Sequence, residues 1–219
     1  YEVVFATPGK QPTEEELLAI LPDCVGYLAG VESISARVLA EAAGLKVISR
    51  NGTGVENIDL AAAQAQGIRI CRAEGANARG VAELTMGLIL SLVRSIPFSD
   101  AALKDRDWQR RKGVELAGRM LGLIGCGKIG KLVCRLALAF GMDVLACDPY
   151  PDEGFAPSEA FGYCGLDELL ANSHVISLHC PAQRDGRPLI DRERIAAMTE
   201  GVYLVNTARG ALLDDAAVL

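Results

Sequence analysis

The sequence predicts an α/β protein made of two doubly wound parallel-sheet domains. Strand-like apolar runs alternate with helix-like stretches along most of the 219 residues, which is typical of parallel sheets covered by helices. Half of the residues are hydrophobic and only 5% are aromatic, as in Ala-, Leu- and Val-rich α/β proteins. A glycine-rich turn also follows an apolar run near the middle of the chain. We expect the domains to cover residues 1–96 and 97–219, with the boundary near 96–116.

The first half of the chain predicts a strand at its start, followed by alternating helices and strands. Thr13 and Glu16 form a capping-box pattern that begins a helix. Gly44 and Gly67 follow helical stretches at the position where glycine commonly ends a helix, and Pro97 ends or kinks a long helix. The expected strands are 1–7, 24–28, 45–49 and 68–71, and the expected helices are 13–21, 35–43, 57–66, 80–95 and 98–108.

The second half continues the alternation. We expect strands at 121–124, 142–147, 174–180 and 201–206, a short strand near Tyr163, and helices at 128–140, 166–171, 191–198 and from Asp214 onward. A complete Rossmann domain has six strands, so this domain is unfinished at Leu219. We therefore expect the natural chain to be truncated here at its C-terminus. Because residue 1 is Tyr rather than Met, we also expect it to begin earlier.

Gly125, Gly127 and Gly130 form a G-x-G-x-x-G pattern between a strand and a helix, and Asp148 follows the next strand. We expect Gly125 to form the tight turn, Gly127 to let a pyrophosphate approach, and Gly130 to let helix and strand pack closely. The helix that begins at Lys128 offers N–H groups and its positive dipole end to phosphates. The Asp148 carboxylate suits ribose hydroxyls and repels a 2′-phosphate, so the expected cofactor is NAD. The alternative is a turn that only shapes an α/β domain.

The composition disfavours several other classes of protein. The formal net charge of −6 argues against nucleic acid as a partner. The seven cysteines include no C-x-x-C pair, which argues against disulfides and metal sites and indicates a reducing, cytoplasmic location. The longest apolar run, from Val81 to Val93, contains Glu83, so we expect no membrane partner, and no signal peptide is evident.

Several phrases together resemble the D-2-hydroxyacid dehydrogenase family, most closely its phosphoglycerate dehydrogenase branch. Besides the glycine turn and Asp148, they are residues 50–59 (RNGTGVENID), 77–85 (NARGVAELT), 175–181 (VISLHCP) and 205–210 (VNTARG). They follow the family's order over nearly the whole chain. The resemblance implies a flavodoxin-like substrate domain, a Rossmann NAD domain and an active site between them. It also implies an oxidoreductase that transfers a hydride between nicotinamide and C2 of a D-2-hydroxy acid, of a 3-phosphoglycerate-like kind.

The resemblance assigns roles on the cofactor side. It makes Arg209 the catalytic arginine, and chemistry explains the residue type, because a guanidinium fork binds a planar carboxylate and polarises the reacting carbonyl as Lys does not. It implies that the cofactor is held by Gly125, Gly127, Lys128, Ile129, Gly130, Asp148, Cys180, Thr207 and Ala208. It gives His179 no role as the base, because the family's base is a later His in a Pro-His pair.

The substrate side is expected in the first half of the chain. The strand-end loop of Asn51, Gly52, Thr53 and Gly54 is expected to bind the small anionic 2-hydroxy or 2-keto acid through its N–H groups. By analogy Asn77 and Arg79 face the same cleft. Arg79 and Arg50 are candidates for a second anionic group such as a phosphate, and the alternative for both is a solvated surface arginine.

Two departures from the family leave alternatives open. The family's catalytic Glu and His would lie beyond Leu219, and Ala73-Glu74 replaces a frequent Thr-Pro. The rival hypotheses are a non-catalytic NAD-sensing regulator or corepressor on the same fold, and a sibling dehydrogenase for glyoxylate, lactate or phosphite. By analogy, the long helix after Gly80 helps to form a homodimer. The sequence does not select the acid or the direction of the reaction.

Overall fold

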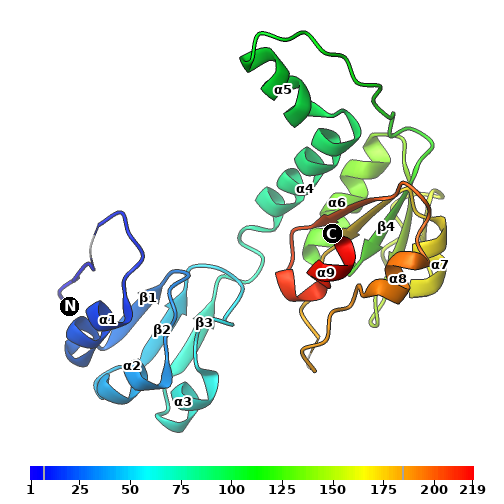
Figure 1. Ribbon diagram of the computed structural model, residues 1–219. Coiled ribbons are helices and arrows are strands. Elements are labelled where there is room, and N and C mark those ends of the chain that lie inside the picture. The colour runs from blue at the N-terminus through cyan, green and yellow to red at the C-terminus, as the bar shows by residue number, and fades with distance from the viewer. Residues whose placement is uncertain (7, 184) are drawn as a thin grey trace. The chain divides into compact units, whose positions relative to one another are not determined.

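The computed structural model describes residues 1–6, 8–183 and 185–219. The chain divides into two compact units, Tyr1–Asn77 and Ala78–Leu219, and each has its own parallel sheet (Figure 1). The division lies after Asn77 rather than between residues 96 and 97, because the helix that follows Asn77 packs on the sheet of the second unit. The α/β class is confirmed in both units.

The first unit alternates short helices and strands. Its strands pair in the order β1-β2-β3, all parallel. Its elements are α1 (Glu14–Ile20), a 3-10 turn (Leu21–Asp23), β1 (Gly26–Ala29), α2 (Ala36–Glu41), β2 (Val47–Arg50), α3 (Leu60–Ala65) and β3 (Arg69–Arg72). Thr13 forms the complete capping box with Glu16, and Ser35 and Asp59 cap α2 and α3 through their side chains. These three caps set where the helices begin.

Helices cover one face of this sheet. Ile48 of β2 packs in a core with Leu17, Leu39 and Ala63, which come from the three helices, whereas Leu28 on the other face of β1 is 70% exposed. The unit is therefore covered on one face in the described residues, and not on both. The flavodoxin-like arrangement expected here needs five strands, of which the described residues form three.

The strand expected at 1–7 is wrong for the residues that the structure describes. Residues 1–6 have no regular secondary structure, Val3 and Phe5 are largely exposed, and Thr7 lies outside the described residues. The composition favours a strand, but a strand also needs a hydrogen-bonded neighbour. The outer edge of β1 pairs with none of the described residues.

The second unit has a five-stranded parallel sheet in the order β6-β5-β4-β7-β8. Numbered within the unit this is 3-2-1-4-5, the first five strands of the Rossmann order. Its elements are α4 (Ala78–Val93), α5 (Ile96–Lys104), β4 (Met120–Ile124), α6 (Lys128–Ala139), β5 (Asp143–Cys147), β6 (Phe161–Tyr163), α7 (Leu166–Asn172), β7 (Val175–Leu178), α8 (Arg192–Ala196), β8 (Tyr203–Asn206), a 3-10 turn (Gly210–Leu212) and α9 (Asp215–Val218).

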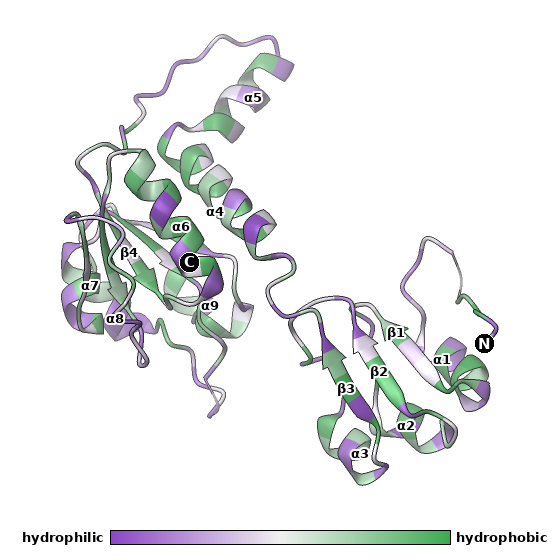
Figure 2. Ribbon diagram, turned by 180° about the vertical axis from the view of Figure 1, so that it is seen from behind, coloured by the Kyte–Doolittle hydropathy of each residue, from purple (hydrophilic) through white to green (hydrophobic). Residues whose placement is uncertain are grey.

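Helices cover both faces of this sheet. On one face Ile89 of α4 and Val133 of α6 pack with Leu123 of β4. On the other face Leu169 of α7 packs with Ile176 of β7. In Figure 2, α6 carries purple residues among green ones, as a helix with one face on a sheet should. The doubly wound arrangement is therefore confirmed in this unit.

The break between α4 and α5 differs from its expected position. Ser95 adopts a left-handed conformation with φ of 51° and ends α4, while Pro97 lies in the first turn of α5. Proline fits there because the first helical N–H groups have no intrahelical partner. Among the described residues no single helix is long and apolar enough to cross a membrane, and α4 with α5 reaches that length only across a 67° bend.

Gly122 in the middle of β4 gives a test of this packing. A methyl group there would meet Ser173 Oγ and lie 2.5 Å from Leu169 Cδ2, so we expect Gly122→Ala to lower the free energy of unfolding by about 2–3 kcal/mol. Gly162 in β6 is the matched control, because a methyl group there has no described atom within 4 Å. Urea denaturation of both variants checks this, and equal stability of the two would contradict the packing described.

Candidate functional site

The glycine turn joins β4 to α6 and is too tightly packed for side chains at two positions. Gly125 has φ of +96°, and a Cβ there would lie 2.7 Å from the carbonyl carbon of His179 and 2.8 Å from the Cys180 nitrogen. A Cβ on Gly130 would collide with the Gly125 carbonyl oxygen. The turn therefore requires glycine at both positions, whether or not a ligand binds.

Gly127 is different, because a Cβ at this position would have no described protein atom within 4 Å. It is the N-cap of α6 and caps it without a side chain, so the first N–H groups of a twelve-residue helix face open space. Lys128 is exposed and Ile129 half-buried in the first turn. A helix start of this kind is suited to a phosphate group, so the residues here fit the pyrophosphate of a dinucleotide.

Asp148 lies at the end of β5, directly beside the turn. Its Oδ2 accepts a hydrogen bond from the Cys126 N–H at 2.7 Å, and its Oδ1 accepts one from the Tyr150 N–H at 2.9 Å. The carboxylate is thus fixed in place by the glycine turn itself. Each oxygen keeps a further lone pair for a ribose hydroxyl.

The loop after β7 forms the other side of the turn. Burial lowers the pKa of His179 to about 4, so its imidazole is neutral at physiological pH. Its Nε2 lies 2.9 Å from the buried Ser177 hydroxyl. Cys180 is half-buried, and burial raises the pKa of its thiol, which keeps it protonated. These groups form a wall without formal charge.

Arg209 follows β8 and is held by a side-chain clamp. The Asn206 Oδ1 accepts from the Ala208 N–H at 2.9 Å, and its Nδ2 donates to the Arg209 carbonyl at 2.8 Å. The Arg209 Nη1 donates to the Ala208 carbonyl at 2.9 Å. The guanidinium therefore lies at the carboxyl edge of the sheet, where ligands of α/β proteins bind.

The carboxyl edge of the second sheet brings most of the predicted cofactor residues together. Asp148 follows β5, the glycine turn follows β4, Cys180 follows β7, and Thr207 follows β8. These four strands are neighbours. A dinucleotide centred on the turn would extend over β5 in one direction and over β7 and β8 in the other.

The loop of Asn51, Gly52, Thr53 and Gly54 lies at the carboxyl end of β2 in the first unit. The Asn51 N–H donates to the Ala29 carbonyl and the Gly52 N–H to the Arg50 carbonyl, both at 2.8 Å. Within the described residues, the N–H groups of Thr53 and Gly54 donate to no protein acceptor. An anion that binds this loop would use these two groups.

The Arg50 side chain points inward, away from the solvent-exposed side of the loop at residues 51–54. Only 9% of it is exposed, and its guanidinium donates to the Asn51 carbonyl at 2.8 Å and to Asn57 Oδ1 at 3.3 Å. It supports the loop from below and places a positive charge under it. Arg79, at the start of α4, is exposed and pairs with Glu83 at 3.2 Å, and Asn77 is also exposed.

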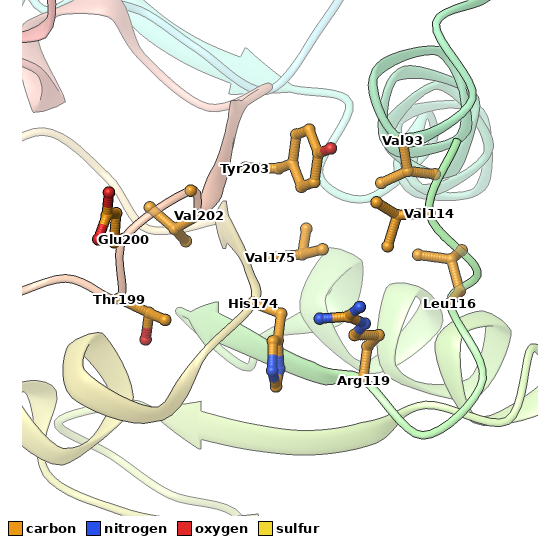
Figure 3. Close-up of a pocket in the computed structure, with 11 residues that line it drawn as sticks. Val93, Val114, Leu116, Arg119, His174, Val175, Thr199, Glu200, Val202 and Tyr203 are labelled. Atoms are coloured by element: carbon orange, nitrogen blue, oxygen red, sulfur yellow. The ribbon is translucent and has the colours of Figure 1, made fainter. Parts of the chain in front are cut away.

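A pocket of about 120 Å³ lies at the opposite, amino edge of the second sheet (Figure 3). Arg119, His174 and Tyr203 line it where β4, β7 and β8 begin. His174 Nδ1 accepts a hydrogen bond from the Met120 N–H at 3.0 Å, so its ring is fixed by the backbone. Because α/β ligands bind at the carboxyl edge, we do not assign the cofactor to this pocket.

Two positioning residues were missed in the sequence. Asn206 lies in the phrase VNTARG, and a strand-end Asn before a turn is the available signal for a backbone clamp. Thr85 lies in the apolar helix α4, where it is fully buried and contacts the Thr207 hydroxyl at 2.9 Å. A threonine within an apolar helix was the signal, but its partner is more than a hundred residues away in sequence.

Comparison with known proteins agrees with this geometry. Residues 86–219 match the family described as "D-isomer specific 2-hydroxyacid dehydrogenase, NAD binding domain". A hydroxypyruvate reductase of Thermotoga maritima is 42% identical over 208 residues, which are 94% of this chain and 67% of that protein. A D-3-phosphoglycerate dehydrogenase of Methanocaldococcus jannaschii is 41% identical over 210 residues, which are 94% of this chain and 40% of that protein.

Solved structures are also similar to this chain. A protein of Thermus thermophilus superposes with a TM-score of 0.87 at 38% identity, over 96% of this chain and 68% of that one. A D-lactate dehydrogenase of Aquifex aeolicus complexed with NAD and lactic acid superposes with a TM-score of 0.81 at 34% identity, over 95% and 62% of the two chains. The chain thus spans from two fifths to about two thirds of the length of these relatives.

Gly127 provides a test of the phosphate-binding assignment. We expect Gly127→Ala to keep the wild-type unfolding midpoint, because the methyl group meets no protein atom, but to weaken NADH binding at least about 10-fold. Isothermal titration and thermal unfolding of the same samples measure both effects. Gly130→Ala is the contrasting variant and should lower the unfolding midpoint. Unchanged NADH affinity in Gly127→Ala would contradict the assignment.

Proposed function

The chain belongs to the D-2-hydroxyacid dehydrogenase family, whose members are NAD-dependent, and from this membership we propose that it serves an NAD-dependent oxidoreductase of small 2-hydroxy or 2-keto acids. The observation that carries the proposal is the single edge of the second sheet. It combines the start of a helix suited to a pyrophosphate, the fixed carboxylate of Asp148 suited to a ribose, and Arg209. A second activity has no comparable support.

The cofactor residues divide by strand. Asp148 would hold the adenosine ribose over β5, and the N–H groups at the start of α6 would hold the pyrophosphate. Cys180, Thr207 and Ala208 would then line the nicotinamide side over β7 and β8. NAD supplies a hydride acceptor, and NADH a hydride donor, when bound. The neutral, half-buried wall at His179 and Cys180 would exclude water from that side.

Arg209 is the residue that we propose acts on the substrate. Its guanidinium would bind the carboxylate and the adjacent oxygen together, which orients the acid and stabilises negative charge on the reacting oxygen. The Asn206 clamp limits the freedom of the loop that carries it. Less reorganisation is then needed when charge develops.

The substrate is proposed to be a compact anion. The Thr53 and Gly54 N–H groups offer one anion site, and the buried Arg50 adds positive potential beneath it. A 3-phosphoglycerate-like substrate would carry a second anionic group. Because Arg50 is turned inward, Arg79 is the better of the two predicted arginines for that role. The proposal of a substrate with a second anionic group therefore depends on Arg79.

A substitution at position 209 tests the function. In the full-length protein we expect Arg209→Lys to reduce kcat on a 2-keto acid about 100-fold or more, because Lys keeps the charge but loses the bidentate fork. NADH affinity should change less than about 2-fold. Steady-state kinetics following NADH absorbance measures the first and titration the second. Arg192→Lys, an exposed arginine in α8, is the control. Turnover within about 3-fold of wild type would contradict the role of Arg209.

We also propose that α4 forms a homodimer contact. Leu84, Leu88 and Leu92 follow one another at four-residue spacing and are 57%, 39% and 44% exposed. Such a row lies along one side of a helix and is costly to leave in water. A second copy of the chain would cover it.

The doubly substituted variant Leu84→Asp with Leu88→Asp is therefore expected to sediment as a monomer of 23.2 kDa, and the unsubstituted chain at twice that mass. Analytical ultracentrifugation at micromolar concentration checks this. Phe140→Asp, at an apolar residue with similar exposure (45%) after α6, is the control and should leave the mass unchanged. If the unsubstituted chain sediments as a monomer, the dimer proposal is wrong.

A further inference from the structure

Thr85 is a fully buried hydroxyl on the sheet-facing side of α4. Its Oγ1 lies 2.8 Å from the Val81 carbonyl oxygen, one turn earlier, and 2.9 Å from the Thr207 Oγ1 after β8. Both contacts are within the second unit. The first holds the hydroxyl on its own helix, and the second joins α4 to the strand end that leads to Arg209.

Counting protons fixes the direction of both hydrogen bonds. A carbonyl oxygen can only accept, so the single Thr85 hydroxyl proton is donated to Val81. Thr85 Oγ1 must then accept from Thr207, and the Thr207 hydroxyl proton is used up in this bond. Because Thr85 is 0% exposed, water cannot replace either of these hydrogen-bond partners of its hydroxyl. The Thr207 oxygen is left as an acceptor only.

The position of Thr207 makes the direction of this hydrogen bond relevant to cofactor binding. It follows β8, two strands from the glycine turn and on the side opposite Asp148, which is the nicotinamide side of a dinucleotide centred on the turn. The nicotinamide ring carries a carboxamide with an NH2 donor and a C=O acceptor. A group that can only accept selects the NH2 end.

We propose that Thr85 is a positioning residue that makes Thr207 an obligate acceptor for the carboxamide NH2 of the cofactor. The inference rests on the proposed function, because it needs nicotinamide over β7 and β8. Thr85 touches neither cofactor nor substrate and acts through Thr207. Fixing the carboxamide fixes which way the ring lies, and therefore which face of the ring is presented.

Three ligands separate this role from general damage. NADH carries the carboxamide, its reduced 3-acetylpyridine analogue has a methyl ketone without the NH2 donor, and ADP-ribose has no ring. We expect Thr85→Val to weaken NADH binding about 3- to 10-fold, because the freed Thr207 hydroxyl no longer presents a fixed acceptor to the NH2 group, and ADP-ribose binding less than about 2-fold. The preference for NADH over the acetylpyridine analogue should shrink by the same factor, because the freed Thr207 hydroxyl can donate to a ketone. Titration of the purified chain measures all three affinities.

Two further variants complete the experiment. Thr85→Ser keeps the hydroxyl and should keep the wild-type preferences. Thr199→Val removes another hydroxyl that donates to a backbone carbonyl, that of Ala171 at 3.0 Å, but at the amino edge of the sheet, and should change none of the affinities. Equal weakening of NADH and ADP-ribose by Thr85→Val, or an unchanged ratio, overturns the inference alone. Failure of the unsubstituted chain to bind both NADH and ADP-ribose overturns the proposed function, and the inference with it.

Discussion

The architecture of the candidate site depends on a main-chain contact without side chains between β4, the start of α6 and the loop after β7. Gly125 and Gly130 meet at this contact, and the backbone at His179 and Cys180 closes it from the neighbouring strand. Because no side chain separates the segments, the first N–H groups of α6 lie close to the sheet edge and to Asp148. The positions of the proposed ribose and pyrophosphate sites both follow from this contact. The same turn that exposes the start of the helix also donates a hydrogen bond to the carboxylate of Asp148.

Hydrogen bonds to the backbone hold Asp148 and the loop that carries Arg209 along this edge. Asp148 accepts from two N–H groups, and Asn206 both accepts from and donates to the loop of Arg209. Hydrogen bonds to backbone groups have fixed geometry, so these residues need little reordering when a ligand binds. The neutral imidazole of His179 adds shape without a competing charge. The site is therefore largely preorganised in the second unit.

The sequence predicted the second unit better than the first, and the reason is local. Gly125, Gly127, Gly130 and Asp148 act within one β-α-β unit, and helix signals such as Thr13 and Asp214 act within one turn. By contrast, whether residues 1–6 form a strand depends on pairing with a strand that is distant in sequence. The inward direction of the Arg50 side chain depends on Asn57 and on the Asn51 carbonyl. The contact between Thr85 and Thr207 joins two segments that only the tertiary fold brings together. Such pairings leave no periodic trace in the sequence.

Helix α4 follows directly on the boundary between the two units, and more than one of its sides has a role. Its inner side supplies Ile89 and Met86 to the core, its buried Thr85 hydroxyl contacts Thr207 before Arg209, and its outer side carries the row of leucines. An exchange at one of these positions therefore disturbs the core, the contact with Thr207 or the row of leucines. Homologous proteins should consequently vary less in α4 than in peripheral helices of equal exposure, and adaptation to a new acid should proceed through loops rather than through this segment.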